Sequence, residues 1–183
     1  GTTNSTDLVF KVNDIECGRP VDLTLGNVTY GTLLASVTTG YNNLGIGNNS
    51  LTNITSGYDN TAVGNGSMIN MTTGANNVCV GTQTLDNITT GTRNTAIGRS
   101  SGFRIVDGSY NTLIGHSADV ALGDGNANKR IALGHGATAD DDYQFAIPDD
   151  VTTIKFRGLV YNLPTSQAAG VLTNDGSGNL TWV

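Results

Sequence analysis

The hydrophobic and polar positions of this chain recur every seventeen residues, a distance that matches neither the period of a helix nor that of a strand. One recurring column is large and apolar, and it contains Ile54, Met71, Ile88, Ile105 and Leu122. A second column is asparagine, and it contains Asn43, Asn60, Asn77, Asn94, Asn111 and Asn128. Five or six copies in one register indicate a repeat architecture.

Glycine follows the same step, in one column from Gly40 to Gly125 and a second from Gly47 to Gly115. The last copy reaches its second glycine, Gly134, only after two extra residues, Lys129 and Arg130. A seventeen-residue unit rich in Gly, Asn and Thr is too short for a helical hairpin and poor in helix formers. It fits one coil of a β-solenoid, so we predict an all-β fold, a parallel β-roll or β-solenoid, over residues 27–139.

The residues after each asparagine predict a short strand whose alternate positions face opposite sides. The positions expected to fill the coil are Leu44, Thr61, Val78, Thr95 and Thr112, together with Ile46, Val63, Val80, Ile97 and Ile114. The positions between them are Gly45, Ala62, Cys79, Ala96 and Leu113, four of the five small and none charged. This pattern favours a subunit interface on the outer face; the alternative is a flat, exposed sheet.

The asparagine column has a structural explanation, because asparagine adopts turn conformations and its side chain can hydrogen-bond from coil to coil. Cys79 occupies a position that is alanine in other copies, so it is expected to be a small buried thiol.

Composition narrows the choice of partners. Of the 183 residues only 13% are charged, and the net charge is −6. This balance argues against nucleic acid and anionic membranes, which attract clusters of Lys and Arg. No apolar run approaches the roughly 20 residues of a membrane-spanning helix, and membrane insertion of this segment is not expected. A polar or sugar-like partner fits better.

The phrases NTAVG, NTAIG and NTLIG, beginning at Asn60, Asn94 and Asn111, resemble the head repeats of trimeric autotransporter adhesins and of related viral and phage tail fibres. The resemblance implies a left-handed parallel β-roll and a homotrimer packed about a common axis. The longer unit here, with the second phrases SLTNITSG and TLDNITTG, is more similar to the fibre versions.

The flanks predict three further segments: a β cap over residues 1–26, a collar or neck over 140–162, and a linker with a β-hairpin over 163–183. In the hairpin, Val171–Thr173 is expected to face Leu180–Trp182. This C-terminal sequence resembles the segment that follows the shaft in viral and phage fibres, which favours a virion over a bacterial surface.

Aromatic and arginine side chains at the turns are the candidate ligand contacts. Aromatic rings stack on sugars and arginine donates hydrogen bonds to hydroxyl and carboxylate groups. The candidate glycan-binding residues are Tyr41, Tyr58, Tyr110, Arg93 and Arg99. The alternative is that these are ordinary exposed turn residues.

No motif for a nucleophile, a phosphate loop or a metalloprotease occurs, so we expect no enzyme, no catalytic residue, no cofactor and no metal site. The acidic runs 140–142 and 149–150 favour solvated loops over calcium ligands, and His116 and His135 favour exposed turns. Two other solenoid classes are weaker alternatives. Left-handed β-helix acyltransferases use eighteen-residue coils, and ice-binding solenoids need an unbroken threonine array.

Together these features predict a fibre or adhesin segment that attaches a virion, or alternatively a bacterial cell, to a host receptor or polysaccharide. The sequons at Asn48, Asn53, Asn65, Asn70 and Asn87 arise readily in an Asn- and Thr-rich repeat.

Overall fold

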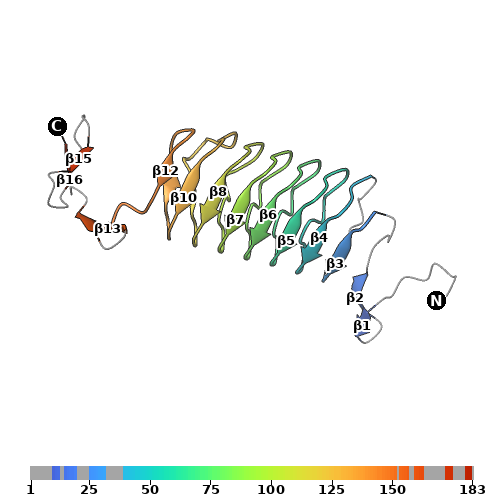
Figure 1. Ribbon diagram of the computed structural model, residues 1–183. Coiled ribbons are helices and arrows are strands. Elements are labelled where there is room, and N and C mark those ends of the chain that lie inside the picture. Colours follow the sequence, from blue (N-terminus) through green and yellow to red (C-terminus); the bar gives the residue numbers. More distant parts are fainter. Residues whose placement is uncertain are drawn as a thin grey trace. The chain divides into compact units, whose positions relative to one another are not determined.

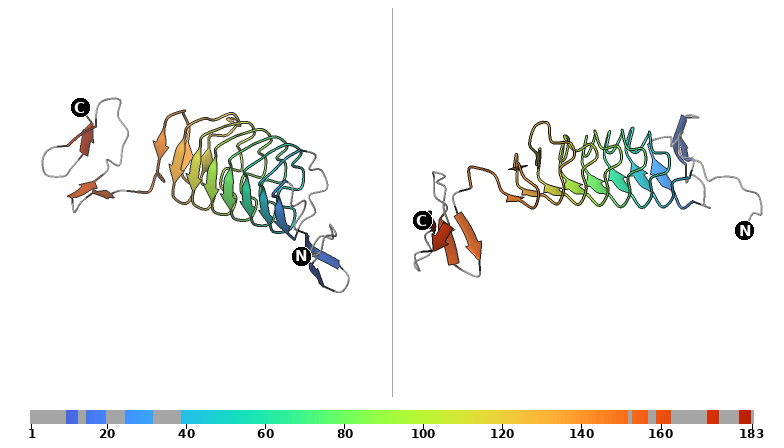
Figure 2. Two further views of the ribbon diagram at one scale, coloured as in Figure 1. Left: turned by 45° about the vertical axis from the view of Figure 1, so that its right-hand side comes forward. Right: turned by 90° about the horizontal axis from the view of Figure 1, so that it is seen from above.

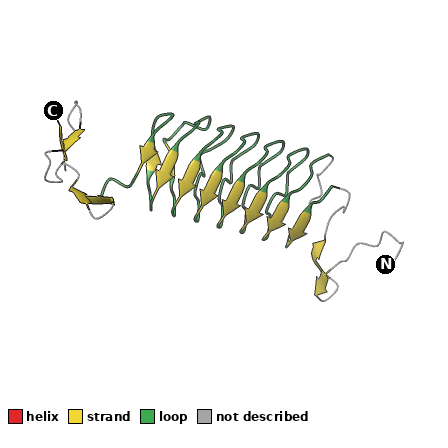
Figure 3. Cartoon of the chain, viewed as in Figure 1, coloured by secondary structure: helices red, strands yellow, loops and turns green. Residues whose placement is uncertain are grey.

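The computed structural model describes residues 10–12, 15–19, 25–31, 39–151, 153–156, 159–162, 172–174 and 180–182. These residues form strands and turns, and no helix occurs among them (Figure 3). By its internal contacts the chain divides into two units, Gly1–Ala146 and Ile147–Val183. The all-β class expected from the sequence is confirmed.

A ten-stranded sheet organises the first unit, and its strands lie side by side in nearly sequential order (Figure 1). Its strands are β1 (Phe10–Val12), β2 (Ile15–Arg19), β3 (Val28–Tyr30), β4 (Leu44–Ile46), β5 (Thr61–Val63), β6 (Val78–Val80), β7 (Thr95–Ile97), β8 (Thr112–Ile114), β10 (Ile131–Leu133) and β12 (Phe145–Ala146). From β3 to β12 every pairing is parallel, whereas β1, β2 and β3 pair antiparallel.

The parallel strands belong to successive turns of a β-solenoid, which winds through about seven coils (Figure 2). Thr61 pairs with Val78 and Thr95 with Thr112, so neighbouring strands are offset by the seventeen residues of the sequence repeat. A second, short ladder joins β9 (Asp119–Val120) to β11 (Thr138–Ala139) in parallel. The repeat period therefore corresponds to one coil.

The asparagine column forms a continuous buried ladder, as expected. Each side-chain oxygen accepts hydrogen bonds from the backbone N–H and the side-chain Nδ2 of the next asparagine; between Asn60 and Asn77 both distances are 3.0 Å. Each Nδ2 also donates to a turn carbonyl, such as that of Gly91 for Asn77, at 2.8 Å. The same bonds recur from Asn27 to Asn111. The ladder fixes the register of every coil on the next.

The inward and outward positions of each strand are the opposite of those expected from the sequence. The residues expected at the subunit interface, Gly45, Ala62, Cys79, Ala96 and Leu113, are buried inside the chain's own coil. Their neighbours on each strand, expected to fill the coil, face outward and are half-buried or exposed. The reason is the thinness of the solenoid. Large turn residues such as Leu51, Ile54, Leu85 and Ile88 already fill the interior from the opposite wall, so the sheet must contribute small residues.

One coil exchanges a large and a small residue between these two walls. Leu113 is the one large side chain in the small sheet column, and Gly102 replaces the Leu51, Met68 or Leu85 of the turn column. A Cβ at Gly102 would come within 3.0 Å of a methyl of Leu113 and 2.6 Å of a methyl of Leu85. The two columns therefore share one space, and the total volume in it is conserved.

The two extra residues of the last coil lie in the loop between Val120 and Ala127, and not at Lys129 and Arg130. Thr112 pairs with Ile131, so Arg130 stands where the ladder would place an asparagine, and its N–H donates to Asn111 Oδ1 at 3.0 Å. Asn128 is consequently off the ladder. Leu122, expected in the buried apolar column, lies in this loop and is 88% exposed.

The expected segments beyond the array have different outcomes. The parallel sheet continues through β12 to Ala146, so Phe145 belongs to the array and not to the expected collar that begins at residue 140. In the second unit, β13 (Thr153–Phe156) and β14 (Leu159–Asn162) form one antiparallel pair. β15 (Leu172–Asn174) and β16 (Leu180–Trp182) form the expected hairpin, with Leu172 opposite Trp182. The expected linker at 163–170 lies outside the described residues.

Candidate functional site

The outer face of the large sheet carries two columns of outward side chains, which we call the outer stripe. One column is hydrophobic throughout and contains Tyr30, Ile46, Val63, Val80, Ile97, Ile114 and Leu133, whereas the other contains Val28, Leu44, Val78 and Ile131 together with three threonines, Thr61, Thr95 and Thr112. The columns run from coil to coil because successive strands pair in register. The side chains in the stripe that are 39–45% exposed are Val28, Tyr30, Ile46, Val78, Val80, Ile97, Ile131 and Leu133. Val63 and Ile114 lie in the same columns and are half-buried. Exposed hydrophobic surfaces that run along several strands are typical of protein, membrane or ligand contact sites.

The turn that precedes each strand carries four of the five candidate glycan contacts. The rings of Tyr41 and Tyr58 stack on each other, with centroids 5.0 Å apart and planes 9° from parallel. Arg93 Nη1 donates to the hydroxyl of Tyr110 at 2.8 Å, and its guanidinium lies 5.2 Å from that ring's centre. These side chains pair with each other between neighbouring coils, so their immediate role is to extend the coil-to-coil contacts to the surface.

The fifth candidate, Arg99, lies at the other end of its strand, beyond Ile97. Its column continues into His116 and His135, whose rings stack 5.2 Å apart. The structure therefore does not bring Arg99 together with Arg93 and the tyrosines. Among the residues described, no group of three or more metal-ligating side chains is present, and the two histidines are exposed turn residues.

A shallow hollow of about 230 Å³ lies between two neighbouring coils, and the sequence gives no direct indication of it. It is lined by Ser100, Phe103 and Arg104 from one coil and by Ser117 and Asp119 from the next. Asp119 occupies the column that is Leu51, Met68 and Leu85 in earlier coils, and it begins strand β9 instead of a turn. This change of backbone path between the two coils coincides with the hollow.

The carboxylate of Asp119 is buried and well satisfied. It accepts hydrogen bonds from the N–H of Val120 at 2.9 Å and of Arg104 at 3.3 Å, and Arg104 Nη1 lies 3.5 Å away. Burial raises the pKa of Asp119, and these donors and the positive charge of Arg104 oppose that rise. A signal was present in the sequence, since an aspartate interrupts an apolar column.

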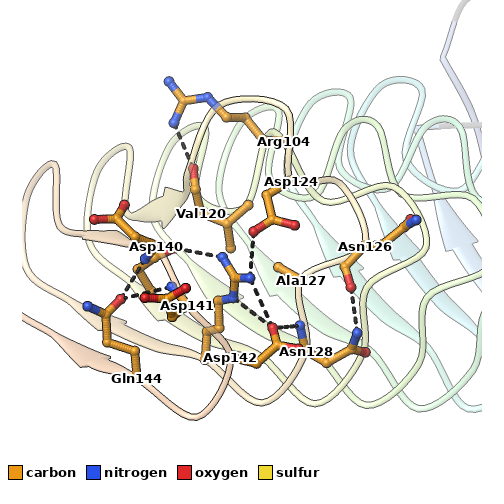
Figure 4. A network of polar contacts seen from close by, with 12 residues as sticks. Arg104, Val120, Asp124, Asn126, Ala127, Asn128, Asp140, Asp141, Asp142 and Gln144 are labelled. Carbon is orange, nitrogen blue, oxygen red and sulfur yellow. Dashed lines mark hydrogen bonds and ion pairs between the residues drawn. The ribbon is translucent and has the colours of Figure 1, made fainter.

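A second charged cluster, around Arg130, links the last coils of the solenoid (Figure 4). The buried Arg130 guanidinium lies 2.5 Å from Asp124 and 3.0 Å from Asp142, and it donates to the carbonyl of Ala139 at 3.0 Å. The N–H of Asn128 and the Arg130 side chain lower the pKa of Asp142. Asp140 and Asp141 are exposed, so the acidic run is a solvated loop with one structural member, Asp142.

The asparagines of three sequons take part in coil-to-coil hydrogen bonds. Nδ2 of Asn53, Asn70 and Asn87 donates to a carbonyl of the next coil at 2.8–2.9 Å. The Thr55, Thr72 and Thr89 hydroxyls, at the third position of each sequon, also donate to the next coil. These residues are therefore used to stack coils.

Cys79 is expected to be chemically inert in the folded chain. Its side chain is fully buried, and burial raises the pKa of the thiol to about 12. Since the thiolate is the reactive form, a Cys17→Ser variant, which leaves Cys79 as the sole thiol, should not react with a thiol reagent at pH 8. It should react fully in guanidinium chloride. Stoichiometric labelling of the native protein would contradict the buried position.

Searches against protein-family models, curated proteins and solved structures find no match to this chain. In the part of the chain that the structure describes, no helix is long and apolar enough to cross a membrane.

Proposed function

We propose that the chain is a homotrimeric fibre or adhesin segment, displayed on a virion surface, that attaches the particle to a host receptor or polysaccharide. A bacterial trimeric adhesin head is the alternative for the same assembly. The observation that supports the proposal best is the outer stripe, because it offers an association surface along the whole solenoid.

The outer stripe is suited to a second and third copy of the same chain. Full burial of a Val, Leu or Ile side chain contributes about 1.5–3 kcal/mol, so covering side chains that are two-fifths exposed contributes about 1 kcal/mol each. The repeated strand spacing lets identical stripes meet in one register along their length. The resemblance of the repeat phrases to trimeric head repeats favours three copies over two.

The dimensions also fit a rod-like spacer. Parallel strands lie about 4.8 Å apart, so the seven steps from β3 to β12 span roughly 34 Å. The turns at both ends of the strands stay exposed when the stripe is covered, and they carry the residues that differ between coils. Receptor contact is therefore assigned to the turns, and assembly to the sheet.

A variant with Val80→Lys and Ile97→Lys tests the assembly. Both side chains are about 40% exposed in the single chain, so the coil should tolerate the change, while two charges in the covered stripe should prevent association. Light scattering should give three times the chain mass of 18.9 kDa for the wild type, and one chain mass for the variant.

Thr82→Lys is the control, since Thr82 is exposed in a turn outside the stripe and should keep the trimer. A wild-type protein with the mass of one chain at micromolar concentration would overturn the proposed assembly. Binding of labelled wild-type protein to host cells, and its loss in the double variant, would test attachment; no binding by the wild type would overturn it.

A further inference from the structure

We propose that the hollow between Phe103 and Asp119 binds one carboxylated sugar unit of a host polysaccharide, such as a uronic acid. The inference rests on the proposed attachment function and names the ligand class and the site. The hollow lies where the turn of one coil meets strand β9 of the next.

The free donors of Arg104 select the carboxylate. Its Nη1 donates to the carbonyl of Val120 at 3.1 Å, which fixes one end of the guanidinium (Figure 4). Among the described residues, this nitrogen alone of the guanidinium makes a hydrogen bond or ion pair. The remaining N–H groups form a planar donor edge on a side chain that is 40% exposed. A guanidinium edge of this kind matches the two oxygens of a carboxylate.

Asp119 positions the arginine through one nitrogen and leaves the other guanidinium donors to the ligand. Its carboxylate is buried and occupied by the N–H groups of Val120 and Arg104. The ion pair with Nη1 holds one terminal nitrogen of the guanidinium and leaves Nε and Nη2 available. Asp119 is therefore a positioning residue in this site.

Phe103 and two serines provide the remaining features of a sugar site. Phe103 is 41% exposed, so its ring offers an apolar surface to the C–H groups of a pyranose. Ser100 and Ser117 add hydroxyl groups to the lining. A volume of about 230 Å³ lies below the roughly 300–1,000 Å³ of pockets for drug-sized molecules, and it suits a single ring.

The equivalent positions of the earlier coils lack this combination. In place of Phe103 and Arg104 they carry Thr52 and Asn53, Ile69 and Asn70, and Asp86 and Asn87. The three asparagines donate their Nδ2 to the next coil. Arg104 makes the equivalent coil-to-coil hydrogen bond through Nη1. Its remaining N–H groups have no partner among the described residues, so this position can both stack coils and bind a ligand.

Titration of the full chain with sodium glucuronate, with glucose and acetate as matched probes, tests the site by NMR or calorimetry at constant ionic strength. Glucuronate should bind in the millimolar range, and glucose and acetate each about tenfold more weakly or worse, since each supplies only part of the contacts. Arg104→Gln should reduce glucuronate binding to the level of glucose. Phe103→Ala should weaken glucuronate and glucose alike, by about fivefold.

Arg93→Gln is the control, because it removes an exposed arginine that pairs with Tyr110 and does not line the hollow, so it should leave the titration unchanged. Equal glucuronate binding by the wild type and Arg104→Gln, equal affinity for acetate and glucuronate, or no binding at all would each overturn the inference. A trimer that attaches to cells equally well with Arg104→Gln would reject this site alone. A monomer that binds glucuronate through Arg104 would reject the proposed assembly alone.

Discussion

Replacing Gly64 by alanine should lower the free energy of unfolding by about 3–6 kcal/mol, the largest effect expected for a single methyl group in this chain. Gly64 has a φ of +141°, a conformation that side-chain-bearing L residues avoid. An added Cβ would also lie 2.5 Å from the carbonyl carbon of Gly81 in the next coil. The backbone cannot retreat, because its neighbours on both sides are coils of the same stack.

Guanidinium chloride denaturation at fixed protein concentration measures this effect, and the midpoint should fall by about 1 M. Gly136→Ala is the matched control. Gly136 also has a positive φ, +69°, but a Cβ there meets nothing within 4 Å. The control should cost only about 1–2 kcal/mol. Equal losses in the two variants would show that conformation alone, and not the close approach of coils, sets the cost.

Asn77→Ala should cost about 3–5 kcal/mol, because it interrupts the asparagine ladder in the middle of the array. The change leaves the carbonyl of Gly91 without its donor. It also removes the acceptor of two N–H groups of Asn94, the backbone amide and Nδ2. Both asparagines are at most 1% exposed, so water cannot replace these bonds. Each buried group left unpaired costs about 1–3 kcal/mol.

Asn65→Ala provides the comparison for this second change. Asn65 is exposed, and its side chain makes no hydrogen bond to the described residues, so its replacement should change stability by less than about 0.5 kcal/mol. Thermal and chemical unfolding of both variants measure the difference. A loss below about 1 kcal/mol in Asn77→Ala would show that the ladder is a consequence of the fold and not a main cause of its stability.

The repeat step, the strands and the ladder could be predicted from the sequence because each depends on local chemistry repeated in register. A seventeen-residue spacing between asparagines requires one coil per repeat, and a buried asparagine needs partners in the next coil. The C-terminal hairpin likewise followed from two short apolar runs around a polar turn.

The sequence did not predict correctly which positions of each strand are buried inside the coil. A three-residue strand has only one alternation, and its pattern does not state which side is inside. The deciding information lay in the opposite wall, where Leu51, Ile54 and their equivalents leave room only for small residues. The exchange of Leu113 with Gly102 was the sequence signal for this, because a compensating pair implies that both side chains share one space.

The candidate site was also predicted only in part. Tyr41, Tyr58, Arg93 and Tyr110 lie on one exposed edge, as a column of turn residues must, but the separation of Arg99 follows from the strand between it and Arg93. The hollow at Arg104 depends on a change of backbone path at Asp119. Such a change departs from the repeat, so the recurring columns of the sequence do not predict it.

Arg130, at the end of the asparagine ladder, limits where further coils can be added. Arg130 accepts the place of an asparagine by donating its N–H to Asn111, but it has no amide oxygen to offer onward, and the N–H of Gln144 in the following coil bonds to Asp141 instead. A duplicated coil inserted anywhere between Asn27 and Asn111 would find both its donor and its acceptor. A coil inserted directly after Arg130 would lack the acceptor for its asparagine N–H groups, so duplication of an internal coil is the extension that preserves the ladder.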